Sequence, residues 1–129
     1  HPGVAVSTRW AYAELDRAGR PEPPPLEPLI EALRRGDLRA LAPLLFNAFE
    51  EAVIRRHPEI GRALSFLKGA GALKALMSGS GSTAVGVMAS RSEAESAEAL
   101  ARESLPAHWT IAAVPNLSAR PAASKPICG

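Results

Sequence analysis

Residues 73–89, LKALMSGSGSTAVGVMA, change the hydrophobic period of the chain and decide its predicted fold. Two short apolar, partly β-branched runs, residues 73–77 and 83–89, flank the small-residue segment 78–82. Runs of this length and composition are typical of strands, and a segment of serine and glycine between them is typical of a loop. The stretch therefore predicts a β-hairpin.

Apolar residues outside this hairpin recur mainly at helical spacing, and two further short runs are apolar enough to form strands. The predicted helices cover residues 8–18, 26–35, 37–45, 49–56, 58–69 and 90–105. Additional strands are expected at residues 4–6 and 109–114. In chain order these elements form a split βαβ arrangement with extra helices inserted after the first strand. We therefore expect an α+β, ferredoxin-like fold whose antiparallel sheet is covered by helices on one face.

Size, charge and cysteine content exclude several classes of protein. With 129 residues, of which 47% are hydrophobic, the chain fits one globular domain. A net charge of +2 and an aromatic content of 5% do not fit a nucleic-acid-binding surface. No apolar run reaches the ~20 residues that cross a bilayer, so we expect a soluble, cytoplasmic protein that binds neither nucleic acid nor membrane. The only cysteine, Cys128, excludes an internal disulfide and is expected to be a free thiol.

The loop of the hairpin is the most informative motif for function. Glycines between hydroxyl residues allow the backbone to come close to a ligand and to point successive amides at phosphate oxygens. The loop nevertheless lacks the lysine of a nucleotide-binding phosphate loop, and it leads into a strand rather than a helix. On spacing alone, an ordinary flexible hairpin is therefore the simpler interpretation.

A family resemblance changes that interpretation. It is carried by three separated segments: VST (residues 6–8) with Tyr12, NAFE (47–50) with HPEI (57–60), and LMSGSGS (76–82). In this order and spacing, the segments resemble the C-terminal half of a small-molecule kinase of the GHMP superfamily. The resemblance implies a C-terminal kinase domain over residues 1–117, and we expect residues 118–129 to form a flexible tail.

The resemblance also implies which parts of the enzyme are missing. In this superfamily the glycine-rich ATP-phosphate loop, the catalytic aspartate and its companion lysine belong to an N-terminal domain, and no segment here resembles them. The first residue, His1 rather than Met, also suggests a cut from a longer polypeptide. We therefore expect ATP and Mg²⁺ to serve the full-length enzyme, with no cofactor, metal site or catalytic residue in this domain alone.

The resemblance assigns roles to particular residues of this chain. It places the third motif of the family, which supports the ATP-phosphate loop, at Gly79, Ser80, Gly81 and Ser82. It likens Tyr12 to an aromatic residue that stacks on the cytosine ring of the substrate, and Thr8 to a hydroxyl residue that lines the cytidine pocket. From the residues alone, a core aromatic beside Leu15 is the favoured interpretation of Tyr12. Thr8 could be a plain helix cap, and a cap hydroxyl can also face a pocket.

Several other polar and aromatic residues have simpler structural interpretations. Asn47 is expected to cap its helix or to fix the nearby loop through its amide. Glu50 and Glu51 fit a solvated first turn, where negative charge complements the helix dipole. His57 is expected to be a surface residue at a helix start. Trp10 and Trp109 are expected to be packing residues, with an interface as the alternative for Trp10.

Taken together, the residues and the resemblance predict the substrate-binding C-terminal domain of a kinase that phosphorylates a cytidine-diphosphate-linked sugar alcohol. Its partner is the missing N-terminal domain, and the isolated fragment is expected to be inactive. One alternative is another kinase of the superfamily, such as a homoserine or mevalonate type. A second alternative is a free-standing ferredoxin-like regulatory module whose loop binds a small anion.

Overall fold

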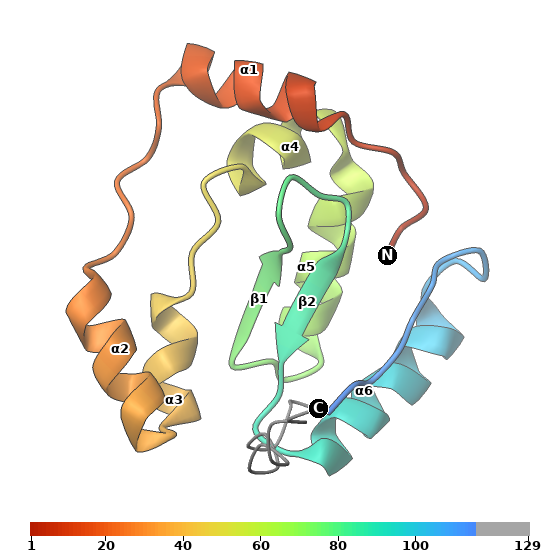
Figure 1. Cartoon of the computed structure of the whole chain (residues 1–129). Helices are drawn as coiled ribbons and strands as arrows, with labels where there is room; N and C mark the ends of the chain where they lie inside the picture. Colours follow the sequence, from red (N-terminus) through yellow and green to blue (C-terminus); the bar gives the residue numbers. More distant parts are fainter. Residues whose placement is uncertain (116–129) are drawn as a thin grey trace, which may run out of the picture.

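The computed structural model describes residues 1–115, and the predicted tail with Cys128 lies outside the described residues. The helices are α1 (Thr8–Ala18), α2 (Leu26–Arg35), α3 (Leu38–Leu41), the 3₁₀ helix η1 (Ala42–Leu44), α4 (Glu50–Arg56), α5 (Pro58–Gly69) and α6 (Arg91–Ser104). Strands β1 (Lys74–Met77) and β2 (Ala84–Val87) form an antiparallel hairpin (Figure 1). None of the described helices is long and apolar enough to cross a membrane.

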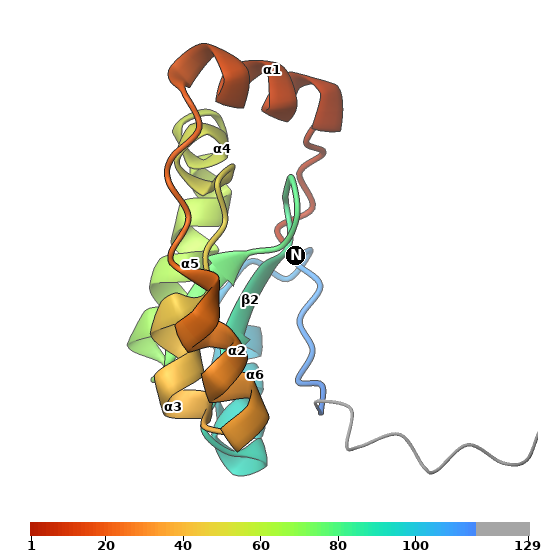
Figure 2. The same cartoon turned by 60° about the vertical axis from the view of Figure 1, so that its left-hand side comes forward.

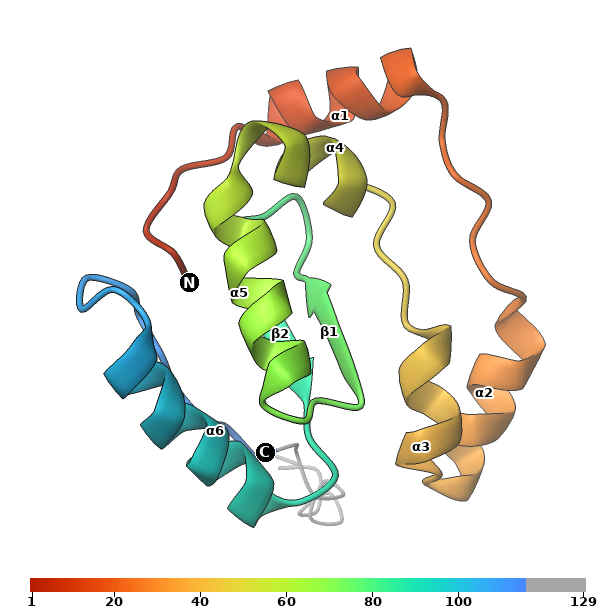
Figure 3. The ribbon, with the colours of Figure 1, turned by 180° about the vertical axis from the view of Figure 1, so that it is seen from behind.

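The hairpin and α5 form the centre of the molecule. Lys74 pairs with Val87 and Met77 with Ala84, so alternate side chains of both strands point toward α5, which covers one face of the hairpin (Figure 3). A Cβ atom on Gly86 would lie 2.8 Å from Leu67 Cδ2, which shows how closely β2 approaches the helix. The core consists of six buried residues, Ala11, Val53, Ile60, Leu64, Ala75 and Met77.

The other helices surround this centre. Helix α1 lies across the end of the hairpin where the chain turns from β1 to β2, next to α4 (Figure 2). The α2–α3 pair and α6 lie on opposite sides of the hairpin (Figure 1). The predicted α+β class with an antiparallel sheet and helices is confirmed.

The predicted strand at residues 4–6 is wrong, although the segment is extended. Val4 and Val6 pack against the core while Ala5 is exposed, which is the alternation that a strand would show. Pro2 has no N–H to donate, and Gly3 has φ +77°, outside the extended region. The start of the chain therefore cannot continue a regular ladder beside the hairpin.

The predicted strand at residues 109–114 is also wrong, because side chains of α6 occupy its backbone groups. Arg102 Nη2 donates to the Ile111 carbonyl at 2.8 Å, and Ala113 N donates to Glu98 Oε2 at 2.9 Å. The segment meets the amino end of the chain through one residue pair. Thr110 N donates to His1 O at 3.0 Å, and the His1 amino group donates to Thr110 O at 2.8 Å.

Helix ends follow local sequence signals. Ser7 caps α1 by accepting a bond from Trp10 N at 3.3 Å. Ser90 caps α6 by accepting from Glu93 N, while Glu93 Oε2 accepts from Ala89 N at 3.0 Å. These contacts form a capping box from Ser90 and Glu93, with the glutamate bond shifted one residue before the cap.

Candidate functional site

The predicted phosphate-loop support, residues 79–82, lies in a tight turn of residues 78–83 between the two strands. Ser78 N donates to Thr83 O at 2.8 Å, and Gly81 N donates to Ser78 O at 3.1 Å. Gly79 has φ +56° and Gly81 has φ +97°, both in the region that favours glycine. The glycines of the motif therefore have a conformational reason to be there.

Gly81 has a second reason, which is close packing. A Cβ atom at this position would lie 2.9 Å from Met77 Sδ, 3.3 Å from Val6 Cγ2 and 3.4 Å from Val53 Cγ1. Met77 and Val53 belong to the buried core. The loop backbone therefore contacts the core directly at Gly81, and this contact fixes the position of the loop relative to the core.

Asn47 holds the first half of the loop in place. Its Nδ2 donates to the carbonyl oxygens of Met77 at 2.5 Å and Gly79 at 2.9 Å, and its Oδ1 accepts from Phe49 N at 2.8 Å. The amide therefore uses both of its ends, one on the loop and one on the chain entering α4. The interpretation of Asn47 as a residue that fixes the nearby loop is confirmed.

Glu50 does not lie on a solvated face, so that prediction is wrong. Its Oε2 accepts a hydrogen bond from Met77 N at 2.8 Å, and the residue is half-buried. Glu51, its neighbour, is exposed and pairs with Arg55 at 2.8 Å. Met77 N lies on the outer edge of β1, so the Glu50 carboxylate takes the place of a neighbouring strand there.

Helix α1 meets the loop through Thr8. The Thr8 and Ser80 hydroxyl oxygens lie 3.0 Å apart within hydrogen-bonding geometry. Ser7 provides the cap of the helix, so the Thr8 hydroxyl is free for this contact, and the alternative of Thr8 as a plain cap is wrong. The structure thus brings two predicted site residues together that are 72 positions apart.

Tyr12 lies one helical turn beyond Thr8, on the same side of α1. Its side chain is 49% exposed, whereas Leu15 of the same helix is 5% exposed. The ring packs edge-on against Phe49, with centroids 4.8 Å apart and planes at 77°. The alternative of a core aromatic therefore does not fit, because the ring is supported from one side and open to solvent elsewhere.

Ser82 differs from the other loop residues because its side chain points inward. It is only 3% exposed, and its hydroxyl contacts Val4 O at 2.6 Å and His1 Nε2 at 3.1 Å. His1 carried no local signal in the sequence, since neither motif nor period connects it with a loop 81 positions away. Sequence reasoning therefore missed it.

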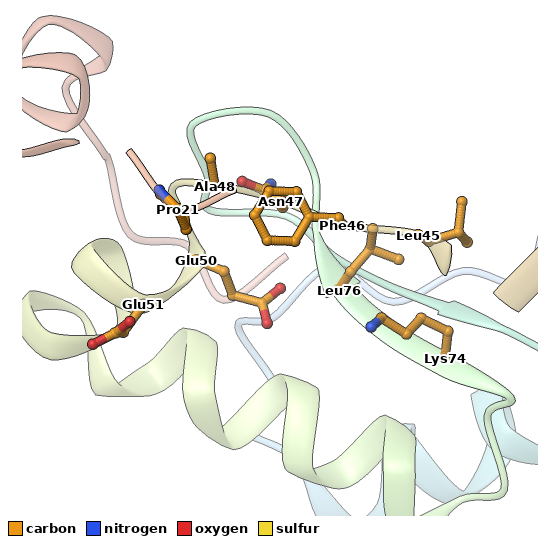
Figure 4. A pocket seen from close by; sticks show the side chains of 9 residues that line it. All are labelled: Pro21, Leu45, Phe46, Asn47, Ala48, Glu50, Glu51, Lys74 and Leu76. Atoms are coloured by element: carbon orange, nitrogen blue, oxygen red, sulfur yellow. The ribbon is translucent and has the colours of Figure 1, made fainter. Parts of the chain in front are cut away.

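Two pockets lie next to the loop, and Asn47 and Glu50 line the first of them. One, of about 210 Å³, is lined by Pro21, Leu45, Phe46, Asn47, Ala48, Glu50, Glu51, Lys74 and Leu76. The Glu50 and Lys74 side chains point toward each other across it (Figure 4). The other, of about 170 Å³, is lined by Ala5, Ser7, Trp10, Arg56 and His57. Within residues 1–115, no group of three His, Cys, Asp or Glu side chains could hold a metal ion.

The aromatic residues around the second pocket pack α1 onto α4 and α5. The Arg56 guanidinium lies 4.6 Å above the Trp10 ring, and the His57 ring meets Trp10 edge-on at 6.0 Å. Trp109 is 7% exposed. The tryptophans are packing residues, as predicted. The prediction of His57 as a surface residue is wrong, because it is half-buried at the junction of α4 and α5 and packs against Trp10.

Comparisons with known proteins connect this geometry to a kinase family. The family model described as "GHMP kinases C terminal" matches residues 29–107. A 4-diphosphocytidyl-2-C-methyl-D-erythritol kinase of Synechococcus sp. is 43% identical over 114 residues, which cover 82% of this chain and 35% of the relative. The kinase of the same name from Geotalea daltonii is 38% identical over 119 residues, covering 91% of this chain and 39% of the relative.

A solved structure agrees with these relatives. The crystal structure of a 4-(cytidine 5'-diphospho)-2C-methyl-D-erythritol kinase superposes with a TM-score of 0.63 at 30% identity, over 79% of this chain and 37% of that one. The chain spans 32–39% of the length of the curated kinases to which it is similar.

Proposed function

Because the chain belongs to the GHMP kinase C-terminal family, we propose that it is the substrate-binding part of a 4-diphosphocytidyl-2-C-methyl-D-erythritol kinase. The complete enzyme transfers the γ-phosphoryl group of ATP to the 2-hydroxyl of the methylerythritol unit. This reaction belongs to the non-mevalonate route of isoprenoid biosynthesis, in the cytoplasm. The missing partner is an N-terminal domain that carries the ATP-phosphate loop.

The hydrogen bond between Thr8 and Ser80 carries this proposal. It joins the helix that bears Tyr12 to the loop that resembles the third motif of the family, at a distance of 3.0 Å between the hydroxyl oxygens. The two elements are therefore two parts of one surface. A substrate with a base at one end and a phosphate acceptor at the other needs such a pair of adjacent elements.

Tyr12 is suited to hold the cytosine ring. Its side chain is half-exposed, and the edge-on contact with Phe49 restricts its orientation. A phenol ring held in this way offers a π-face to a base while its hydroxyl stays in water. The Thr8 hydroxyl, one turn away, lines the same side of α1.

The loop is suited to support the ATP-phosphate loop rather than to catalyse phosphoryl transfer. It contains no lysine, and the part of the chain described by the structure offers no carboxylate cluster for Mg²⁺. We therefore place the Mg²⁺ ligands and the catalytic groups in the N-terminal domain. Phosphoryl transfer depends largely on positioning and charge stabilisation, so a domain that holds one substrate contributes without supplying a base.

The experiment that tests the proposal measures cytidine-substrate affinity in the polypeptide that joins this chain to its ATP-binding domain. Replacing Tyr12 by Ala removes the stacking face and should weaken affinity by roughly 5- to 150-fold, as expected for one base-stacking aromatic. Tyr12→Phe is the matched control, because it keeps the ring and should stay near the unsubstituted affinity. Unchanged affinity in Tyr12→Ala, measured by calorimetry, would favour another kinase of the family, such as a homoserine or mevalonate type.

The isolated chain gives a second test. We expect the purified chain to show no ATP-dependent phosphorylation of the cytidine substrate, because the residues that hold ATP lie in the N-terminal domain. Adding the ATP-binding domain as part of the same polypeptide should restore turnover. Activity of the chain alone would contradict the division of roles proposed here.

A further inference from the structure

The hydrogen bonds around Ser82 determine where its single hydroxyl proton goes. The Val4 carbonyl oxygen, 2.6 Å from Ser82 Oγ, can only accept, so the hydroxyl donates its proton to Val4. His1 Nε2 lies 3.1 Å from the same oxygen. Since the serine proton is already used, the Nε2–H group of His1 must be the donor in this second contact.

The other ring nitrogen of His1 requires the same tautomer. Gly3 N donates to His1 Nδ1 at 3.1 Å, so Nδ1 must carry a lone pair and no proton. Two separate contacts, one at each nitrogen, therefore require a neutral imidazole protonated on Nε2. Two backbone bonds between His1 and Thr110 hold the residue itself in place.

We propose that His1 is a positioning residue for the loop of residues 78–83, and that it acts as the neutral Nε2–H tautomer through Ser82. The loop is held at three points. Asn47 binds the Gly79 carbonyl, Thr8 binds the Ser80 hydroxyl, and His1 binds the Ser82 hydroxyl. The first two contacts fix the side that leaves β1, and His1 fixes the side that enters β2.

This arrangement has a consequence for phosphate binding, which rests on the proposed function of the loop. Gly81 lies between Ser80 and Ser82, and its backbone is pressed against the core. With both neighbouring hydroxyls bonded, the Gly81 peptide keeps one orientation relative to the domain. Without the His1 contact, Ser82 would be held only by Val4, in a segment that pairs with no strand of the sheet.

The tautomer is tested by nuclear magnetic resonance of the ¹⁵N-labelled chain. We expect the His1 Nε2 signal in the range of a protonated nitrogen and the Nδ1 signal in the range of an unprotonated one. Ser82→Ala removes the acceptor of the Nε2–H group and should shift His1 toward a mixture of tautomers. An Nδ1–H tautomer, or an equal mixture in the unsubstituted chain, would overturn the proposal.

The positioning role is tested by exchange of the Ser78 and Gly81 backbone amides, which donate to the Thr83 and Ser78 carbonyls within the loop. His1→Ala should speed their exchange roughly fivefold, the factor expected for the loss of one neutral hydrogen bond. His1→Gln should restore slow exchange, because its amide nitrogen offers a donor near the position of Nε2. Amides of α5 serve as the reference for intact folding. Equal amide exchange rates in His1→Ala and the unsubstituted chain would refute the positioning role.

Kinetics of the enzyme with its ATP-binding domain separate this proposal from the proposed function. His1→Ala should raise KM for ATP, while affinity for the cytidine substrate stays unchanged and His1→Gln recovers the original KM. If the tautomer and the exchange results hold but KM for ATP does not move, the phosphate-supporting function of the loop is wrong, and the positioning of Ser82 by His1 stands.

Discussion

The Gly81→Ala substitution tests whether contact with the core determines the position of the loop of residues 78–83. The new Cβ atom would lie 2.9 Å from Met77 Sδ, closer than carbon and sulfur atoms approach in folded proteins. Met77 is 1% exposed, so its side chain has no open space to move into. The backbone at φ +97° adds strain for any residue with a side chain.

The expected loss of stability follows from these two terms. A non-glycine residue in such a backbone region costs about 1–3 kcal/mol. Forcing one extra methyl group into a packed core costs about 1–3 kcal/mol more. With a urea slope of about 2 kcal/mol per molar, a total of about 2–6 kcal/mol lowers the unfolding midpoint by about 1–3 M.

Gly79→Ala is the matched control because it has the same change of side chain without the crowding. Gly79 has φ +56°, and a Cβ atom there meets nothing within 4 Å. It should cost only about 1 kcal/mol of left-handed strain, or about 0.5 M in the midpoint. Urea unfolding of both variants by circular dichroism would measure the difference. Equal midpoints for the two variants would show that contact with Met77 does not determine the loop position.

Two further substitutions test long-range contacts of Asn47 and Glu98. Asn47→Asp keeps the hydrogen bond from Phe49 N but turns a carboxylate oxygen toward the Met77 and Gly79 carbonyl oxygens. The charged form cannot donate to these carbonyls, so the substitution should lower the urea unfolding midpoint more at pH 7 than at pH 4. Equal losses at both pH values would contradict this. The Arg102 side chain, followed by the Ala113 backbone N–H, holds the pKa of Glu98 below its ordinary value of 4.5. The stabilisation from Glu98 is present above the ordinary pKa and is lost as pH falls through the lower pKa of the folded state. The free energy of unfolding of Glu98→Gln should therefore fall less on acidification than that of the unsubstituted chain. An equal fall in both proteins would refute this.

The fold was predictable wherever a local pattern determines the structure. Helical spacing, the Ser90 capping box and the change of period at residue 73 depend on neighbours within a few positions, and the corresponding elements are present. The two strands predicted at residues 4–6 and 109–114 show the limit of this reasoning. Both segments have strand-like alternation, but a strand also needs a partner along its length. Pro2 and the side chains of α6 prevent that pairing.

In the candidate site too, local features were predictable from the sequence and most long-range contacts were not. The residue types of the loop and of the start of α1 were visible in the sequence because glycine, serine and an aromatic ring carry chemical meaning on their own. The contacts that organise them join positions far apart: Glu50 reaches Met77 over 27 positions, Asn47 reaches it over 30, and His1 reaches Ser82 over 81. A carboxylate in a first helical turn is explained equally well by the helix dipole, so its sequence context alone could not reveal a strand edge that it would bind. The sequence predicted that Asn47 could fix the loop, but only the folded chain shows that Glu50 and His1 also hold the hairpin and that Tyr12 is the exposed aromatic side chain of α1.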